Sequence, residues 1–387
     1  MTGADLDRYD AAALSRRRGA KWAVAKKGEI AAWIADMDFP VAPAVRTALE
    51  SAIADDDLGY PSAALVAQVA QGFAQRAADR YGLVVDPVQV LVTTDVLQGI
   101  ELALLTLTAP GDGVLFFTPS YPPYFSAVED VGRRVVTCEL VEAGGRLEID
   151  GDRLTDVVRA ERPRCILLCN PHNPTGRVFT RRELAAVGEL AADHDLVVLA
   201  DEVHADLTYP GSTHVAFGTL GTEVAERTVT LSSASKAFNL AGLRCAVAAC
   251  GSDSLFTRLD AYPEHARGGL SMPGLLATHA AWRDGGAWLA AVLAELEVGR
   301  DLVVARLGRL PGVRVRAPEA TYLAWLDLRE TDLGTDPAHA LRSRAGVILS
   351  PGELFGASGA GHVRLNFATP RPVLEELIGR IEGAIGA

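Results

Sequence analysis

The sequence has few of the features that mark a membrane-bound, secreted or nucleic-acid-binding protein. No apolar run approaches the roughly 20 residues that a helix needs to cross a bilayer, and the polar stretch at residues 1–20 has no apolar signal core. Lys and Arg number 37 against 49 Asp and Glu, and the resulting net charge of −12 argues against nucleic acid or an anionic membrane as a partner. These absences predict a globular protein that acts away from membranes.

Cysteine is also scarce, with five residues in the chain. Cys165 and Cys169 lie in the run CILLCN, and Cys245 and Cys250 lie in CAVAAC, both of which are typical of buried strands. Their spacing does not match the Cys-x-x-Cys pairs at turns that bind zinc. We therefore interpret these thiols as small core residues in a protein of the reducing cytoplasm.

Short apolar runs recur between residues 90 and 250, namely VLVTT, VLFFT, VVTC, CILLC, LVVLA, TVTL and CAVAAC. Most of them lack apolar–polar alternation, which is typical of strands that are buried on both faces. Helical patterns at residues 98–109 and 181–195 separate some of these runs. The alternation predicts an α/β fold with a mostly parallel sheet covered on both sides, in which ligands bind at the strand ends.

The pattern changes near residue 285. A long amphipathic helix is indicated by steps of three, four and seven between the apolar residues Leu289, Leu293, Leu296, Val303, Leu307 and Leu310. Strands are expected near 313–316, 321–327, 347–349 and 362–368, with helices at 337–345 and 371–385. We expect three parts: an N-terminal segment at 1–45 that contributes to the small domain, a large domain at 46–285, and a small α+β domain at 286–387.

Four short motifs follow predicted strands or lie within them: NPHNPTG (170–176), ADEVHAD (200–206), SASK (233–236) and VRLNF (363–367). Asn173, Asp201 and Lys236 are spaced by 28 and 35 residues, which is about one strand–helix unit each. We therefore expect the three side chains to converge at one rim of the sheet.

An asparagine, a carboxylate and a lysine at one rim suit pyridoxal phosphate. Lys236 can form a Schiff base with the aldehyde of this cofactor. Asp201 can keep the pyridine nitrogen protonated, which makes the ring an electron sink, and the Asn173 amide can donate to the phenolic oxygen. Ser233 and Arg244 can hold the phosphate, whose charge would compensate that of the arginine.

These motifs resemble those of a known enzyme family. The sequence is similar to fold-type I pyridoxal-phosphate enzymes of the aminotransferase class I/II superfamily, and within them to the cystathionine β-lyase (C–S lyase) branch that includes the MalY and PatB proteins. WIADMDF and the histidine of DEVHADL carry the resemblance to the branch. The resemblance spans nearly the whole chain, through the four motifs and residues 31–45, 59–61, 118–124, 349–356 and 361–370. It implies a mostly parallel, seven-stranded sheet.

The resemblance also implies roles for matching residues. Tyr121 would stack on the pyridine ring, and Arg364 would bind the substrate α-carboxylate. Tyr60 would reach the phosphate of the neighbouring subunit's cofactor, because members of this family share their active sites across a homodimer. The predicted set is completed by His204, Ser235, Val96 and Leu97 as cofactor-binding residues and by Trp33 and Asn173 as substrate-binding residues.

The loop TTDVLQGI (93–100) departs from the family pattern, because much of the family has glycine where Asp95 stands. An aspartate there would add a negative charge beside the phosphate. Either its side chain caps the following helix and points away, or the phosphate contact is rearranged. We assign the phosphate contacts to the Val96 and Leu97 amides.

A metal site at Asp201, Glu202 and His204 is disfavoured, because alternation along a strand end would point Glu202 away from the other two. His204 is open to two interpretations, as a residue that packs beside the ring or as one that transfers protons.

The leading functional hypothesis is a homodimer that cleaves cystathionine or another cysteine S-conjugate to thiol, pyruvate and ammonia, with Lys236 as general base. An aminotransferase that acts on a small amino acid would use the same residues. A regulatory protein on the same fold is the third hypothesis.

Overall fold

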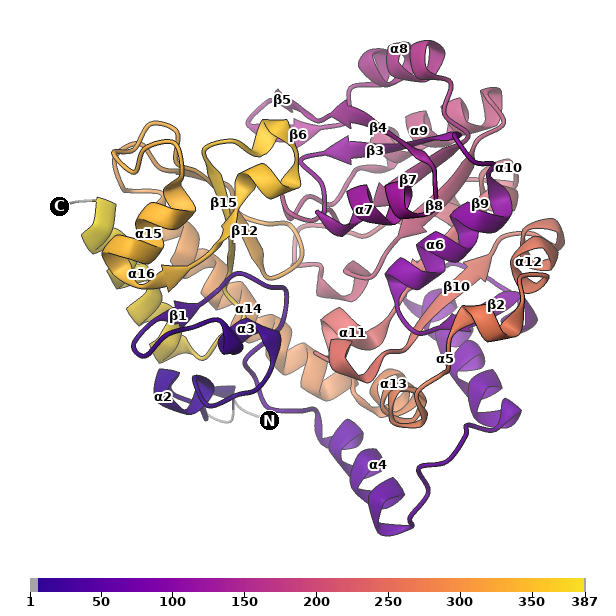
Figure 1. Cartoon of the computed structure of the whole chain (residues 1–387), viewed down its shortest axis with the longest axis horizontal. Coiled ribbons are helices and arrows are strands. Elements are labelled where there is room, and N and C mark those ends of the chain that lie inside the picture. Colours follow the sequence, from indigo (N-terminus) through magenta and orange to yellow (C-terminus); the bar gives the residue numbers. More distant parts are fainter. Residues whose placement is uncertain (1–5, 386–387) are drawn as a thin grey trace.

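The computed structural model describes residues 6–385 and contains two main sheets with helices around them (Figure 1). The larger sheet has seven strands in the order β2-β10-β9-β8-β7-β3-β4. Only β10 runs antiparallel to its neighbours, so the predicted mostly parallel sheet is confirmed. The strands are β2 (Val90–Thr93), β3 (Gly113–Thr118), β4 (Arg134–Glu139), β7 (Cys165–Cys169), β8 (Val197–Asp201), β9 (Thr228–Ser232) and β10 (Ala246–Cys250).

Both faces of this sheet are apolar, which explains why its strands show no alternation in the sequence. In β3, Val114 and Phe116 pack on one face while Leu115 and Phe117 pack on the other, and all four are buried. One face is covered by α6 (Val96–Leu107), α7 (Pro123–Asp130) and α12 (Asp253–Asp260). The opposite face is covered by α5 (Ala63–Tyr81), α8 (Gly151–Glu161), α9 (Arg181–Asp193) and α13 (Met272–Asp284), with α4 (Pro43–Ala54) packed on α13.

The smaller sheet is antiparallel, in the order β11-β12-β15-β14, and is formed by β11 (Arg314–Val315), β12 (Leu323–Asp327), β14 (Ser350–Pro351) and β15 (His362–Asn366). Its helices are α14 (Gly286–Leu307), α15 (Pro337–Ala345) and α16 (Arg371–Ile385). A separate strand from the N-terminal segment, β1 (Ile30–Ala31), pairs in parallel with β13 (Val347–Ile348). The domain boundaries at residues 45 and 285 stay a prediction.

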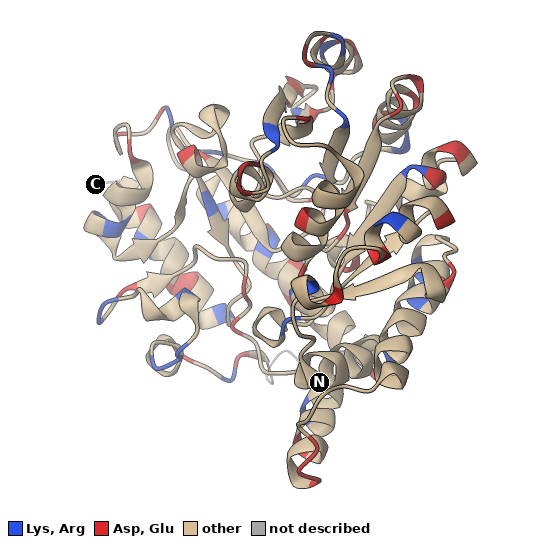
Figure 2. Cartoon of the chain, turned by 45° about the vertical axis from the view of Figure 1, so that its right-hand side comes forward, with Lys and Arg blue, Asp and Glu red and all other residues tan. Residues whose placement is uncertain are grey.

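The remaining α-helices and strands are short. They are α2 (Ala11–Leu14), α3 (Ala20–Ala23), α10 (Thr222–Glu226), α11 (Ala234–Ala237) and the hairpin of β5 (Val141–Ala143) and β6 (Arg146–Glu148). Charged residues of both signs are spread over the ribbon, while the strands of the large sheet are mostly uncharged (Figure 2). Within residues 6–385, no helix is both long and apolar enough to cross a membrane.

Residues 33–38, here called the strap, follow β1 and are anchored on several sides. Asp38 is 1% exposed, and its carboxylate accepts hydrogen bonds from the Lys21 ammonium and from the Trp22 indole, each at 2.7 Å. The Asn366 amide of β15 donates to two strap carbonyls at 2.6 and 2.7 Å. The strap is therefore held in one position by buried polar contacts, which are expensive to break in a low-dielectric interior.

We expect Asp38→Ala to destabilise the protein strongly. The substitution leaves the Lys21 ammonium, which is buried, without its carboxylate partner. Removing one member of a buried ion pair costs about 3–5 kcal/mol. The measurement is the urea concentration at half-unfolding, with Asp156→Asn on the exposed side of α8 as the control. A loss no larger than that of the control would show that the buried pair does not hold the strap.

Candidate active site

A cavity of about 270 Å³ lies where the ends of the large-sheet strands meet the strap and β15. Its walls come from segments that are far apart in the chain: the strap, the loop after β2, the start of α7, the ends of β7 and β8, α11 and β15. The predicted residues that line it are Asp95, Val96, Leu97, Tyr121, Asn173, Asp201, His204, Ser233, Ser235, Lys236, Arg244 and Arg364.

Lys236 projects from the one-turn helix α11, which begins at the cap residue Ser233. The Ser233 hydroxyl accepts a hydrogen bond from the Ser235 amide at 3.0 Å, which fixes the turn before the lysine. The Lys236 Nζ donates to the Ala35 carbonyl of the strap at 3.0 Å. Burial lowers the pKa of Lys236, and the nearby Asp36 charge opposes that shift. The amine is therefore more easily neutral than an exposed lysine, as a base or nucleophile must be.

Asp201 is the last residue of β8 and is buried. Its carboxylate accepts hydrogen bonds from the Tyr124 hydroxyl at 2.5 Å and from the Val203 amide at 3.0 Å. Burial raises the pKa of Asp201 to about 6, although both hydrogen bonds favour the charged form. A cationic partner in the cavity would stabilise the carboxylate further.

Tyr124 was missed in the sequence, although TPSYPPY contains a signal. Tyr121 and Tyr124 are three residues apart across the start of α7, so they come to the same side of that turn. Their rings meet edge to face with centroids 5.4 Å apart. Both tyrosines line the cavity, and the Tyr124 hydroxyl donates to Asp201.

Arg364 on β15 is buried and oriented by neutral groups. One of its terminal nitrogens donates to the Asn173 amide oxygen at 2.9 Å, and the other donates to the Trp33 carbonyl at 2.7 Å. Its Nε has no hydrogen-bond partner, and no carboxylate within residues 6–385 pairs with it. Burial lowers the pKa of Arg364 to about 10, so an incoming anion would be strongly attracted. Trp33 thus contributes its backbone here, while its indole nitrogen donates to the Lys21 carbonyl outside the cavity lining.

Asp95 caps the following helix, which is one of the two possibilities raised by its place in the loop after β2. One carboxylate oxygen caps α6 by accepting from the Gln98 amide at 2.8 Å, and the other forms an ion pair with Arg244. The chain thus supplies Arg244 with a carboxylate partner of its own, and compensation of Arg244 by a phosphate stays a prediction. The Arg244 side chain is 59% exposed, so this pair is accessible to solvent. The Ser233 hydroxyl donates to the Cys245 carbonyl at 2.6 Å.

His204 is 2% exposed, and its Nδ1 has no hydrogen-bond partner. Burial lowers the pKa of His204 to about 3, so the ring is neutral. Glu202 turns the other way, where it accepts hydrogen bonds from the Phe217 amide at 2.7 Å and approaches the His214 ring nitrogen at 3.2 Å. Among residues 6–385, no group of three or more His, Cys, Asp or Glu side chains is placed to hold a metal ion.

Two predicted residues do not line the cavity, namely Trp33, as described, and Tyr60. Tyr60 is fully exposed on the segment between α4 and α5. Tyr322 is a further residue that the sequence did not single out. It is buried, meets His204 edge to face, and donates from its hydroxyl to the Ala35 carbonyl at 2.9 Å. It thereby shares this acceptor with Lys236.

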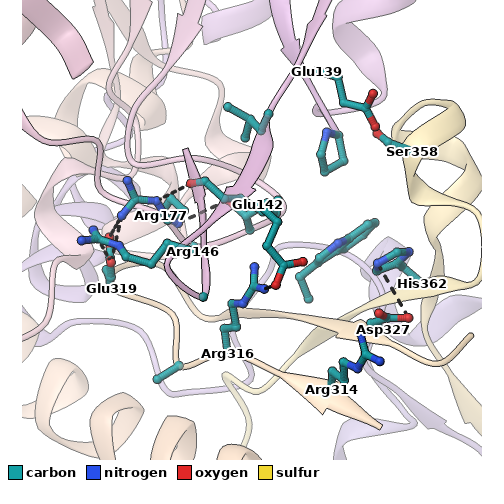
Figure 3. A pocket seen from close by; sticks show the side chains of 18 of the residues that line it. Glu139, Glu142, Arg146, Arg177, Arg314, Arg316, Glu319, Asp327, Ser358 and His362 are labelled. Atoms are coloured by element: carbon teal, nitrogen blue, oxygen red, sulfur yellow. Dashed lines mark hydrogen bonds and ion pairs between the residues drawn. The ribbon is translucent and has the colours of Figure 1, made fainter. Parts of the chain in front are cut away.

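A larger cleft of about 560 Å³ lies between the β5–β6 hairpin and the smaller sheet (Figure 3). Its charges neutralise one another across the cleft: Arg316 pairs with Glu142, and Glu319 accepts from Arg146 and Arg177 at 2.7 and 3.0 Å. It contains neither the lysine nor the buried aspartate of the motifs. The smaller cavity is therefore the candidate active site.

Comparison with known proteins agrees with this geometry. A cystathionine β-lyase of Corynebacterium glutamicum is 32% identical, over 96% of this chain and 98% of its own length. The cystathionine β-lyase PatB of Bacillus subtilis is 32% identical, over 91% and 92% of the two chains. The solved structure of a pyridoxal-phosphate-bound C–S lyase from Staphylococcus hominis has a TM-score of 0.88 and 29% identity, and the match covers 96% of this chain and 97% of that one.

The predicted resemblance to the branch that includes PatB is confirmed. The family model for aminotransferase class I and II matches residues 34–381, from the strap to α16. The chain therefore belongs to the aminotransferase class I and II family.

Proposed function

We propose that this protein is a pyridoxal-phosphate-dependent C–S β-lyase that cleaves cystathionine or another cysteine S-conjugate to thiol, pyruvate and ammonia. The observation that carries the proposal is the partly buried Lys236 amine, which lines the same cavity as an aspartate at the end of β8 and an arginine that pairs with no carboxylate among residues 6–385. The similarity to proteins named cystathionine β-lyase supports the choice of reaction.

The residues of the cavity fit pyridoxal phosphate. Lys236 is the amine that its aldehyde requires, and Asp201 is a buried carboxylate that a protonated ring nitrogen would stabilise. His204 offers a buried ring nitrogen that lacks a partner. The N-terminus of α6, with the amides of Val96 and Leu97, suits a phosphate, because the first amides of a helix are free to bind anions.

The cofactor, when bound, supplies an aldehyde that captures the substrate amino group and a ring that withdraws electrons from Cα. Arg364 binds the substrate α-carboxylate, with Asn173 holding the guanidinium in position. Lys236 Nζ removes the Cα proton, because its lowered pKa keeps a fraction of the amine neutral. Asp201, held by Tyr124, would supply the negative charge that stabilises a protonated ring nitrogen.

The carbon–sulfur bond then breaks, the sulfur leaves as thiolate, and addition of water to the remaining enamine gives pyruvate and ammonia. An aminotransferase would use the same residues, and Lys236 would return its proton to the cofactor instead. The family includes enzymes of that name, so this reaction is the second candidate.

We include in the proposal a homodimer with shared active sites. Leu58 and Tyr60 are separated by one glycine in the chain; Tyr60 is fully exposed and Leu58 is largely exposed. With residues 270–273 they border a hollow of about 380 Å³. Large apolar side chains grouped around a hollow are typical of a surface that another copy covers.

A cytoplasmic location belongs to the same proposal. All five cysteines are free thiols, and all five are buried. Unpaired cysteines suit a reducing compartment.

Product analysis tests the reaction. With cystathionine as substrate, we expect thiol and pyruvate to appear in equal amounts. Alanine or aspartate with a keto-acid acceptor should react more slowly. Faster amino-group transfer than thiol release would replace the lyase with an aminotransferase.

Asp201→Asn should retain the cofactor and lose activity. A neutral amide cannot stabilise a protonated ring nitrogen, and such electrostatic contributions are worth on the order of a hundredfold or more in rate. Cofactor content is measured by absorbance and turnover by thiol release. Tyr124→Phe is the matched control, because it removes one hydrogen bond and keeps the carboxylate, so its loss should be smaller. Near wild-type turnover of Asp201→Asn would contradict the proposed role.

Mixing two inactive variants tests the shared sites. In a random mixture of Tyr60→Ala and Lys236→Ala subunits, half of the dimers are hybrids with one intact site, so activity should reach about a quarter of wild type. Each variant alone is the control. Absence of activity, once subunit exchange has been demonstrated by mass, would show that Tyr60 acts within its own subunit.

A further inference from the structure

The strap brings one carboxylate to the cavity that no mechanism described so far uses. Asp36 lines the cavity and is partly exposed. Its backbone carbonyl accepts hydrogen bonds from Lys21 at 3.1 Å and from Asn366 at 2.7 Å. Its carboxylate has no hydrogen bond or ion pair with any residue in the range 6–385. The backbone is thus fixed while the charged group is free to meet a ligand.

The other acidic groups of the cavity already have partners. Asp95 caps α6 and pairs with Arg244. Asp201 accepts hydrogen bonds from Tyr124 and from the backbone of residue 203. Asp36 is therefore the acidic residue of this cavity that remains available to a cation from solution.

The order of contacts along the strap gives the direction in which a substrate extends. The Trp33 carbonyl contacts Arg364, the proposed carboxylate-binding residue. The Ala35 carbonyl contacts the amine of Lys236, the proposed base at Cα. Asp36 follows Ala35 in the chain, lines the same cavity and lies close enough to Lys236 for its charge to raise the pKa of that amine. A substrate whose carboxylate lies at Arg364 and whose Cα lies at Lys236 would carry its side chain toward Asp36.

We propose that Asp36 is a specificity residue that selects cysteine S-conjugates with a positively charged amino group on the sulfur-bound substituent. This inference rests on the proposed function, because it assumes a substrate with a leaving group on sulfur. An ammonium group on the leaving side would be attracted by a carboxylate in a half-buried cavity, where charge interactions are stronger than in water. A conjugate with an anionic substituent would be repelled.

A different use of Asp36 is also open to test. Among the charged groups near Lys236, the Asp36 carboxylate has the largest effect on the pKa of the amine, which it raises. Asp201 also raises this pKa, and Arg364 lowers it. If Asp36 served the lysine alone, its removal would affect every substrate equally. The two roles therefore differ in whether the effect depends on the substrate.

The experiment compares two conjugates of the same length, S-(2-aminoethyl)-L-cysteine and S-propyl-L-cysteine, which differ only in an ammonium or a methyl group at the end. We expect the holoenzyme to favour the first in kcat/KM by about tenfold or more, as for a charged hydrogen bond. Asp36→Asn should reduce this ratio to near one. Asp156→Asn, which removes an exposed aspartate on α8, is the matched control and should keep the wild-type ratio.

Equilibrium binding gives a second readout that does not depend on turnover. L-Lysine and 2-aminoheptanoate are the carbon analogues of the two conjugates and have no sulfur to release. Calorimetric titration should show tighter binding of L-lysine to the holoenzyme, and Asp36→Asn should remove that preference.

The outcomes separate the two proposals. A wild-type preference that persists in Asp36→Asn, or an equal loss with both conjugates, would overturn the role of Asp36 while the lyase activity stands. Failure of the wild type to release thiol from either conjugate or from cystathionine would overturn the proposed function. In that case the L-lysine titration still decides whether Asp36 binds an ammonium group.

Discussion

The carbonyl of Ala35 is the meeting point on which the candidate active site depends. It accepts hydrogen bonds from Lys236, on the helix that follows β9 of the larger sheet, and from Tyr322, which directly precedes β12 of the smaller sheet. One acceptor on the N-terminal strap therefore sets the position of the reactive amine relative to both sheets. The strap can do this because the buried pair of Lys21 and Asp38 keeps it from moving.

Burial governs the electrostatics of the same site. Desolvation lowers the pKa of Lys236, so its amine loses its proton more easily than that of an exposed lysine. Desolvation also lowers the pKa of His204 to about 3, so that ring is neutral. The same desolvation raises the pKa of Asp201, and two hydrogen bonds oppose it. The cavity thus disfavours isolated charges of either sign, and a ligand that brings complementary charges to Arg364 and Asp201 relieves that cost.

Much of the architecture could be predicted from local patterns. Apolar runs without alternation identified the strands of the large sheet, because both of its faces are covered. The motifs placed Asn173, Asp201 and Lys236 at the strand ends, since parallel strands end at one rim. These inferences need only the spacing of residue types along the chain.

The contacts that hold the site together were not predictable in this way. Tyr124 reaches Asp201 across 77 residues, and Lys236 reaches the strap across 201. Which of several nearby polar groups forms each pair depends on the packing of separate elements. The free carboxylate of Asp36 was hidden for the same reason, because an unpaired charge is recognised only when all its neighbours are known.

The cleft between the β5–β6 hairpin and the smaller sheet has a mechanical consequence. Glu142 on the hairpin and Arg316 beside the smaller sheet are 61% and 43% exposed, and such surface pairs contribute about 0–1 kcal/mol. The free energy of this exposed ion pair is therefore comparable with thermal energy. The contacts at the strap, in contrast, are shielded from solvent and hydrogen-bonded. The contacts at the strap therefore contribute more to holding the two sheets together than the exposed pair of Glu142 and Arg316 does. The same cleft is also crossed by the ion pair of Arg177 and Glu319, whose side chains are 6% and 22% exposed, so opening it would break a well-shielded contact as well as an exposed one.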